Sequence, residues 1–278
     1  MIKLIATDLD GTLLYPKRKI RVLTNKNRNF LRDFVKNGNR LIIVSGRNID
    51  ISSDISKKIG SQVDMIACNG SLTLKDGKVI NESPMNVDDI KQLYEENKNN
   101  PDILSWVVMA NDRPMVIIPV GLNPIMTILY RIGLFFQFKY LEKFVIGEKH
   151  LYKLLEDPEA KIYKVMPLFG LGKKGTLKAR DNISHFIDAY GTKFEILWSS
   201  QSIEFMNKGV NKAKALKEFI ETLDIDPKEV AVVGDSGNDV PLFEAFENSF
   251  VMSHSPEEVK RTAKTQIKGV YCLRDYIY

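Results

Sequence analysis

The sequence predicts an α/β protein, in which a doubly wound parallel sheet is interrupted by an inserted α+β domain. Short apolar runs alternate with helical segments at both ends of the chain, as in parallel sheets that helices cover on both faces. Extended segments in the middle of the chain come in hairpin pairs instead. With 278 residues, 44% of them hydrophobic, the chain is long enough for one large or two modest domains.

The first part of the chain alternates strands and helices. Strands are predicted where short runs are apolar, at residues 4–7, 41–45 and 64–68. Helices are predicted between these strands, at residues 24–36 and 48–59. Thr24 is a suitable N-cap for the first helix, and Gly60 is a suitable stop for the second. Asp76 and Gly77 predict a hairpin turn between two further extended segments.

The last part of the chain repeats this alternation. The sequence predicts a helix at residues 209–223, a fully apolar strand at 230–234 and another helix at 238–246. Residues 255–258, Ser-Pro-Glu-Glu, predict one more helix start, with a capping serine, proline at the first position and glutamate at the third.

The middle of the chain follows a different pattern. Two pairs of extended segments predict hairpins, residues 103–110 with 114–118 and residues 193–200 with 202–206. We therefore expect an inserted α+β domain at 84–207, and a discontinuous core domain made of residues 1–83 and 208–278.

Composition limits the classes of function. The net charge of +5 is mild and the basic residues are scattered, so neither nucleic acid nor an acidic membrane is indicated as a partner. Cys68 and Cys272 lie far apart in the sequence and form neither a disulfide framework nor a zinc-binding pattern. No secretory signal is evident, and we expect a cytoplasmic protein.

One uncharged segment, residues 114–130, requires a check for membrane insertion. Pro119, Gly121 and Pro124 interrupt it, whereas a membrane-spanning helix needs about 20 mostly apolar residues. We expect a strand, a turn and an amphipathic helix there.

Polar residues follow three of the predicted parallel strands, namely Asp8, Ser45 and Asp235. A single aspartate at the end of a strand is usually a cap or turn residue. Ligands of open parallel sheets bind outside the carboxyl ends of the strands, so three such ends with glycine close by predict one functional crevice.

Asp8 and Asp10 are two residues apart, and in an extended chain they share a face. A divalent metal would offset their repulsion, and a site rich in oxygen without histidine or cysteine favours Mg²⁺. Asp235 can supply a third carboxylate, with Asp239 next to it at the start of a helix. Aspartate can also form an acyl phosphate, while a second aspartate serves as acid and base.

A lysine is expected to face this crevice. Lys212 lies four residues before Leu216, on the line of the helix's apolar stripe, so its ammonium needs an anionic partner. Lys214 and Lys217 point away, and Lys208 lies outside the helix. The alternative is that Lys212 is a rim lysine whose stem covers apolar surface.

Four segments together resemble the motifs of the haloacid dehalogenase superfamily: DLDGT (8–12), VSGR (44–47), KGVNKAKAL (208–216) and GDSGND (234–239). Their order, and the insert between the second and third, are similar to the Cof-like phosphatases of that superfamily. CNGS (68–71) resembles the Asn-Gly turn of the same group. The resemblance covers residues 1–83 and 208–278, and implies a Rossmann-like core with the insert as a movable cap that excludes water.

The resemblance implies a role for each matching residue. Asp8 would be the phosphorylated nucleophile and Asp10 the acid and base. Mg²⁺ would be held by Asp8, the backbone carbonyl of Asp10, and Asp235. The phosphoryl group would be bound by the Leu9 amide, Ser45, Gly46, Lys212 and Asn238.

Further residues would support the site. Gly11 would allow a sharp turn, and Thr12 would brace it. Arg47 and Asn69 would line the pocket, or else form a salt bridge and a turn. The chain departs from the family pattern at Ser71 and in the segment after Asp239, beside the site, which leaves the substrate fit open but not the reaction.

Other features are expected to be structural. His150, His185 and His254 match no triad or metal-ligand spacing, and surface or structural roles are expected for them. Trp106 and Trp198 are expected to pack within the insert, and Cys68 is expected to be a buried free thiol. Residues 134–138 are expected to end a helix against the sheet of the insert, with contact to the substrate as the alternative.

These observations predict a magnesium-dependent phosphatase that hydrolyses a small phosphomonoester, such as a sugar phosphate, through an aspartyl-phosphate intermediate. A phosphomutase of the same superfamily is an alternative, because Asp10 could serve either reaction. A ligand-binding regulator on the same fold would be expected to lack a carboxylate or the lysine. The sequence leaves open which small phosphorylated metabolite is the substrate, which cap residues select it, and the oligomeric state.

Overall fold

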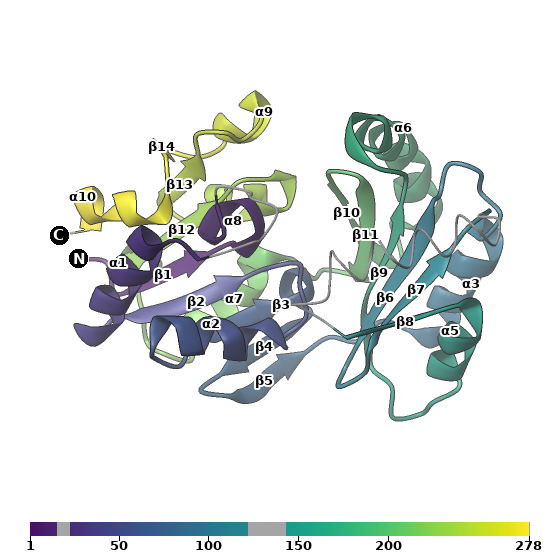
Figure 1. The fold of residues 1–278 in the computed structure, drawn as a ribbon, viewed down its shortest axis with the longest axis horizontal. Helices are drawn as coiled ribbons and strands as arrows, with labels where there is room; N and C mark the ends of the chain where they lie inside the picture. The colour runs from purple at the N-terminus through teal and green to yellow at the C-terminus, as the bar shows by residue number, and fades with distance from the viewer. Residues whose placement is uncertain (16–22, 122–142, 278) are drawn as a thin grey trace. The chain divides into compact units, whose positions relative to one another are not determined.

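The computed structural model describes residues 1–15, 23–121 and 143–277. The chain divides into two compact units (Figure 1). The first unit combines Met1–Glu82 with Val210–Tyr278, and the second unit is Ser83–Gly209.

The first unit is built around one sheet. Its strands are β1 (Leu4–Thr7), β2 (Arg40–Val44), β3 (Asp64–Ala67), β4 (Leu72–Lys75), β5 (Lys78–Glu82), β12 (Val230–Gly234), β13 (Asn248–Met252) and β14 (Thr265–Ile267). They lie in the order β14-β13-β12-β1-β2-β3-β4-β5. The strands from β14 to β3 are parallel, whereas β4 and β5 form an antiparallel extension. Every residue of β1, β3 and β12 is buried, which explains their apolar runs.

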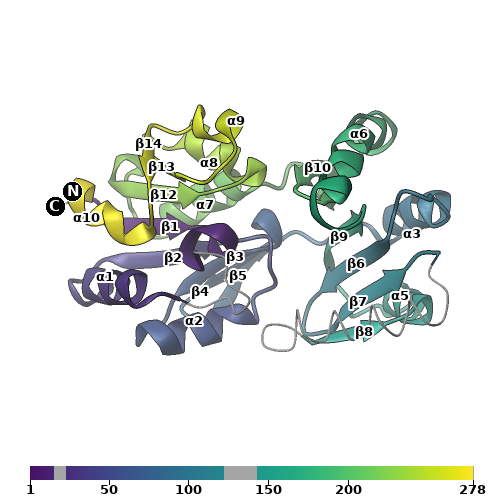
Figure 2. The same cartoon turned by 45° about the horizontal axis from the view of Figure 1, so that its top comes forward.

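Helices cover both faces of this sheet. They are α1 (Asn25–Lys36), α2 (Ile51–Ile59), α7 (Lys212–Glu221), α8 (Val240–Ala245), α9 (Glu257–Lys260) and α10 (Arg274–Ile277). Short helical turns connect them, η1 (Leu9–Leu13), η2 (Cys68–Gly70), η3 (Pro227–Glu229), η4 (Gly237–Asp239) and η5 (Val270–Leu273). Helices α1 and α2 lie on one face, and α7 and α8 on the other (Figures 1 and 2). The doubly wound α/β class predicted from the sequence is therefore confirmed.

The order of the strands defines where a ligand can bind. β1 pairs with β2 on one side and with β12 on the other. The chain first winds from β1 through β2 to β3, and it later returns to place β12 on the opposite side of β1. Crevices form at the carboxyl ends of strands where the winding direction changes, and here those ends lead into Asp8 and Asp235.

Local signals in the sequence predicted some element ends correctly and others wrongly. The Thr24 side chain accepts a hydrogen bond from the Asn27 amide and caps α1. Gly60 ends α2 in a left-handed conformation, with φ of +80°. The predicted start of that helix at residue 48 is wrong. The Asn48 side chain accepts from the Ile49 amide, so the chain turns before α2 begins at Ile51.

The expected serine cap near residue 255 is also wrong. α9 begins at Glu257, with Pro256 at the N-cap position. The Ser255 hydroxyl is buried and has no hydrogen-bond partner within residues 1–15, 23–121 and 143–277. The Ser255 amide instead donates to the Met252 carbonyl, so this serine closes a turn after β13.

The second unit contains a separate sheet. Its strands are β6 (Ser105–Ala110), β7 (Met115–Pro119), β8 (Phe144–Ile146), β9 (Ile162–Leu168), β10 (Phe194–Ser199) and β11 (Ser202–Asn207). They lie in the order β10-β11-β9-β6-β7-β8, and both predicted hairpins, β6 with β7 and β10 with β11, are present. Helices α3 (Val87–Asn97), α5 (Glu148–Leu155) and α6 (Gly172–Tyr190) complete the described part of the unit. Trp106 is fully buried in its core.

The helix expected after residue 121 and the segment 134–138 lie outside the described residues. Within the parts of the chain that are described, no helix combines the length and the apolar character that crossing a membrane requires.

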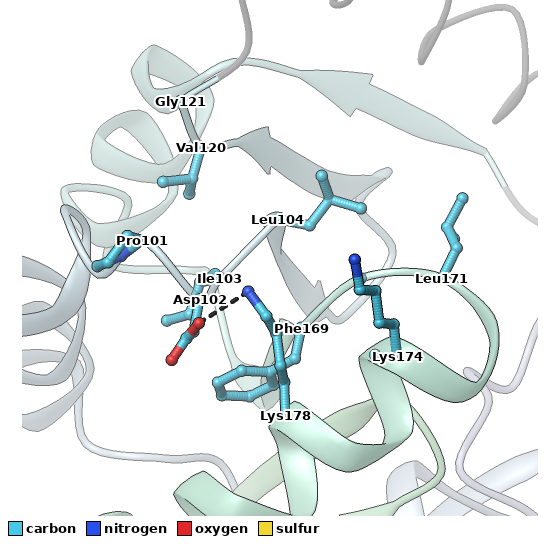
Figure 3. Close-up of a pocket in the computed structure, with 12 residues that line it drawn as sticks. Pro101, Asp102, Ile103, Leu104, Val120, Gly121, Phe169, Leu171, Lys174 and Lys178 are labelled. Carbon is cyan, nitrogen blue, oxygen red and sulfur yellow. Dashed lines mark ion pairs between the residues drawn. The ribbon is translucent and has the colours of Figure 1, made fainter.

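A pocket of about 480 Å³ opens in the second unit (Figure 3). It lies between residues 101–104, the end of β7 and the first turns of α6. Lys178 Nζ pairs with Asp102 Oδ1 at 2.8 Å on one of its walls, and both side chains are more than 40% exposed. Solvent screening limits such a pair to at most about 1 kcal/mol, so it contributes little to the stability of the unit.

Candidate active site

The carboxyl end of β1 turns sharply. The Asp8 amide donates to the Val233 carbonyl at 2.8 Å, which continues the β1–β12 pairing by one residue. The chain then coils into η1, where Gly11 has a φ of +98°. A β-carbon on Gly11 would overlap the carboxylate of Asp235. Glycine therefore permits both the turn and the close approach of the loop that follows β12.

Three carboxylates gather at this turn. Asp8, Asp235 and Asp239 are buried, and one oxygen of each lies within 4.8 Å of the others. Lys212 Nζ donates to Asp8 Oδ1 at 2.9 Å and to Asp239 Oδ1 at 2.6 Å. Three carboxylates against one ammonium leave two negative charges, which is the charge that a divalent cation would neutralise. The oxygen donors suit a hard cation such as Mg²⁺.

The charges in this cluster shift the pKa values of its members. Burial raises the pKa of the Asp8 carboxyl well above its usual range, and Asp239 and Asp235 raise it further, against the opposing effect of Lys212. Burial lowers the pKa of Lys212, but Asp239 and Asp8 outweigh it and leave that pKa above its usual value. The ammonium therefore stays charged, and ionised Asp8 requires further positive charge nearby.

Asp239 also shapes the loop after β12. Its Oδ2 accepts hydrogen bonds from the amides of Asp235, at 2.9 Å, and Ser236, at 3.1 Å. The Asp239 carboxylate thus has two roles. It orients the backbone that carries Asp235, and it accepts a hydrogen bond from Lys212.

Helix α7 directs Lys212 into the cluster. The Asn211 side chain accepts from the Lys214 amide at 2.9 Å and caps the helix. Lys212 is fully buried on the same face as Leu216, whereas Lys214 and Lys217 are exposed. This is the arrangement that the apolar stripe of the helix predicts. Lys208, the weaker sequence candidate, is exposed outside the helix and lies near Glu195.

Gly70 sets the position of the start of α7, and we expect Gly70→Ala to displace it. Gly70 has a φ of +115°, and a β-carbon there would lie 2.6 Å from the carbonyl oxygen of Asn211. We expect a loss of about 1–3 kcal/mol in the free energy of unfolding, measured in urea. Gly38→Ala is the control, because its φ is +84° but no atom lies within 4 Å of the added carbon. Equal losses in both variants would show that the contact with α7 does not matter.

The expectation that Asp8 and Asp10 share a face of an extended strand is wrong. β1 ends at Thr7, and η1 reverses the chain, with the Leu13 amide donating to the Asp8 carbonyl. The Asp10 carboxylate is bound instead by Arg47, through its Nε and through Nη2 at 3.1 Å from Asp10 Oδ1. The cluster of buried carboxylates therefore consists of Asp8, Asp235 and Asp239, and Asp10 is not part of it.

The remaining predicted residues come from neighbouring loops of the same sheet edge. Ser45 follows β2, is buried, and accepts from the Asn69 amide at 3.0 Å through its carbonyl oxygen. Asn238 Nδ2 donates to Asn69 Oδ1 at 3.2 Å. Gly46 follows Ser45 directly, and Leu9 is buried in η1. The loops after β2, β3 and β12 are thus joined by hydrogen bonds.

Sequence reasoning missed that the rings of Tyr15 and His254 lie beside this site. Thr12 Oγ1 donates to Asp235 Oδ1 at 3.1 Å, and His254 Nε2 lies 3.6 Å from Asp235 Oδ2. The imidazole of His254 stacks on Tyr15, with ring centroids 3.9 Å apart. The sequence did contain a signal for His254. This residue follows β13, which neighbours β12, and polar residues after the carboxyl ends of parallel strands are expected to lie near a ligand.

Comparisons with known proteins agree with this geometry. A family model described as haloacid dehalogenase-like hydrolase matches residues 5–270. A phosphoglycolate phosphatase of Methanopyrus kandleri is 24% identical, over 95% of this chain and 89% of that protein. A 5-amino-6-(5-phospho-D-ribitylamino)uracil phosphatase of Escherichia coli is also 24% identical, over 95% and 89%. A haloacid dehalogenase-like hydrolase from B. subtilis superposes with a TM-score of 0.78 at 19% identity, over 100% of both chains. The predicted superfamily resemblance and hydrolase class are confirmed.

Proposed function

This chain belongs to the haloacid dehalogenase-like hydrolase family, and from that premise we propose that it is a magnesium-dependent phosphatase of a small phosphomonoester. The observation that carries the proposal is the buried contact of Lys212 with Asp8, inside a cluster of carboxylates whose negative charge exceeds that of one ammonium. The names of the relatives support phosphate-ester hydrolysis as the reaction, and they leave the substrate open.

Asp8 is proposed as the nucleophile. Its carboxylate oxygen would attack phosphorus, and the bond from phosphorus to the ester oxygen would break, releasing the alcohol and leaving an acyl phosphate on Asp8. Water would then attack the same phosphorus, releasing inorganic phosphate and restoring the Asp8 carboxylate. Lys212 would neutralise negative charge in both steps, together with donors from Leu9, Ser45, Gly46 and Asn238.

Asp10 is proposed as the acid and base. It would donate a proton to the leaving oxygen in the first step, and would accept a proton from water in the second. Arg47 donates hydrogen bonds to both carboxylate oxygens of Asp10 in this structure. The proposed role of Asp10 therefore requires this ion pair to open during turnover. Arg47 would also keep Asp10 in reach of the crevice between turnovers.

Asp8, the backbone carbonyl of Asp10, and Asp235 would hold the magnesium ion. The ion would supply positive charge that lets Asp8 ionise and that offsets the charge of the substrate phosphate. The excess negative charge of the carboxylate cluster and its oxygen-only donors fit this cation.

Magnesium is expected to raise the melting temperature of the protein. A ligand that binds only the folded state adds about 2.7 kcal/mol of stability when its concentration is 100 times its Kd. Asp235→Asn should remove most of this shift, and acidification should shrink it, because a proton on Asp8 competes with the cation. Thermal unfolding across a magnesium titration measures both. Asp188→Asn, an exposed aspartate of the second unit, should keep the full shift.

A panel of phosphomonoesters, assayed with magnesium and with chelator, tests the proposed function. Metal-dependent release of inorganic phosphate from at least one ester, and its absence in Asp8→Asn, would support the phosphatase. Conversion of a hexose 1-phosphate to the 6-phosphate without free phosphate would favour the phosphomutase instead. If no ester across a broad panel releases phosphate, the proposed reaction is wrong. The role of the second unit as a cap and the cytoplasmic location stay predictions.

A further inference from the structure

His254 occupies a tight turn next to the carboxylate cluster. The turn follows β13, where the Ser253 amide donates to the Ile267 carbonyl at 2.8 Å and the Ser255 amide donates to the Met252 carbonyl at 3.0 Å. β13 pairs in parallel with β12, with Val251 opposite Gly234. The carboxyl ends of the two strands therefore bring His254 alongside Asp235.

The imidazole of His254 is held by a second ring. Tyr15, two residues beyond the end of η1, stacks on it at an interplanar angle of 5° and a centroid separation of 3.9 Å. The side chain of His254 is 26% exposed. Stacking restricts the ring to one plane, and its Nε2 lies close to the Asp235 carboxylate.

The two oxygens of Asp235 thus contact different loops. Oδ1 accepts from Thr12 in η1 at 3.1 Å, while Oδ2 lies 3.6 Å from His254 Nε2, slightly beyond hydrogen-bond length. The Thr12 hydrogen bond at Oδ1 and the imidazole close to Oδ2 together limit the rotation of this carboxylate. Outer groups that hydrogen-bond a metal ligand typically change metal affinity by about 10–100-fold when they are removed.

We propose that His254, held in plane by Tyr15, is a positioning residue that orients Asp235 for the divalent cation. The inference rests on the proposed function, because it concerns the cation which that reaction would use. It assigns to His254 no proton transfer and no contact with the reacting phosphorus.

The test is magnesium binding, measured by isothermal titration calorimetry on the full chain. We expect His254→Ala to weaken the affinity by about 10-fold or more. His254→Gln should recover part of the loss, since its amide nitrogen can reach toward the same carboxylate oxygen. Tyr15→Ala should weaken binding in the same direction, whereas Tyr15→Phe keeps the stacking face and should match the wild type.

His150→Ala is the matched control, because this half-buried histidine belongs to the second unit. If His254→Ala binds magnesium as tightly as the wild type, or more tightly, the inference is wrong and the proposed function stands. If the wild type itself binds no magnesium, both fail. Thermal unfolding without metal checks that each variant is folded, and if His254→Ala is not, His254→Gln and Tyr15→Ala decide by the same criteria.

Discussion

Replacing Asp8 by asparagine is expected to abolish phosphomonoester hydrolysis, with kcat at least about 10⁴-fold lower. The amide has the shape of the carboxyl group, but it is a poor nucleophile and cannot form the acyl phosphate. Phosphate release over long incubations at high enzyme concentration measures the residual rate. Asp188→Asn, which is exposed in the second unit, should keep the wild-type rate. An Asp8→Asn variant with substantial activity would show that another residue is the nucleophile.

The same variant is expected to stay folded, and without magnesium to be at least as stable as the wild type at neutral pH. Burial and the neighbouring carboxylates raise the pKa of Asp8 in the folded protein. The folded state therefore binds this proton more tightly than the unfolded state, and stability falls as pH rises from the ordinary aspartate value, about 3.9, through the raised pKa. The Asp8→Asn variant has no group to ionise at this position, so it should not lose this stability as pH rises.

A series of thermal unfolding experiments across this pH window, without metal, measures the effect. The wild type should lose stability with rising pH more steeply than Asp8→Asn over the same interval. Curves of equal slope would mean that Asp8 does not titrate differently in the folded and unfolded states.

Replacing Lys212 by methionine is expected to have the largest effect on stability. Lys212 is fully buried, and its ammonium is the cation that contacts both Asp8 and Asp239. Methionine preserves much of the stem and removes the charge, which leaves two buried carboxylates uncompensated. Breaking a buried ion pair from one side costs about 3–5 kcal/mol. Urea unfolding in the presence of chelator measures this loss, and hydrolysis should be lost as well.

Two further variants identify the cause of this loss. Lys214→Met changes an exposed lysine of the same helix and should alter stability by less than about 0.5 kcal/mol. Combining Lys212→Met with Asp239→Asn removes one of the uncompensated charges. The loss of stability in the double variant should therefore be smaller than the sum of the losses in the two single variants. If Lys212→Met unfolds at the same urea concentration as Lys214→Met, the ion pair contributes no stability.

The sequence by itself determined the features that depend on local pattern. Apolar runs identified β1, β2, β3 and β12, because strands that helices cover on both faces consist mostly of apolar residues. The residues directly after three of these strands were therefore predicted to lie at one edge of the sheet. Helical periodicity was enough to separate Lys212 from Lys214 and Lys217, since the face of a helix that is buried is fixed by spacing alone.

Only the tertiary structure decided which of the polar groups touch. Asp8 and Lys212 are 204 residues apart, and Asp10 pairs with Arg47 across 37 residues. The helical turn that begins at Leu9 interrupts the extended chain between Asp8 and Asp10. Asp239 takes the place of Asp10 in the cluster, and His254 comes beside Asp235 from the next strand. Spacing along the chain constrains which face a side chain is on, but turn geometry and the order of strands decide its neighbours, because those depend on backbone conformation and long-range pairing.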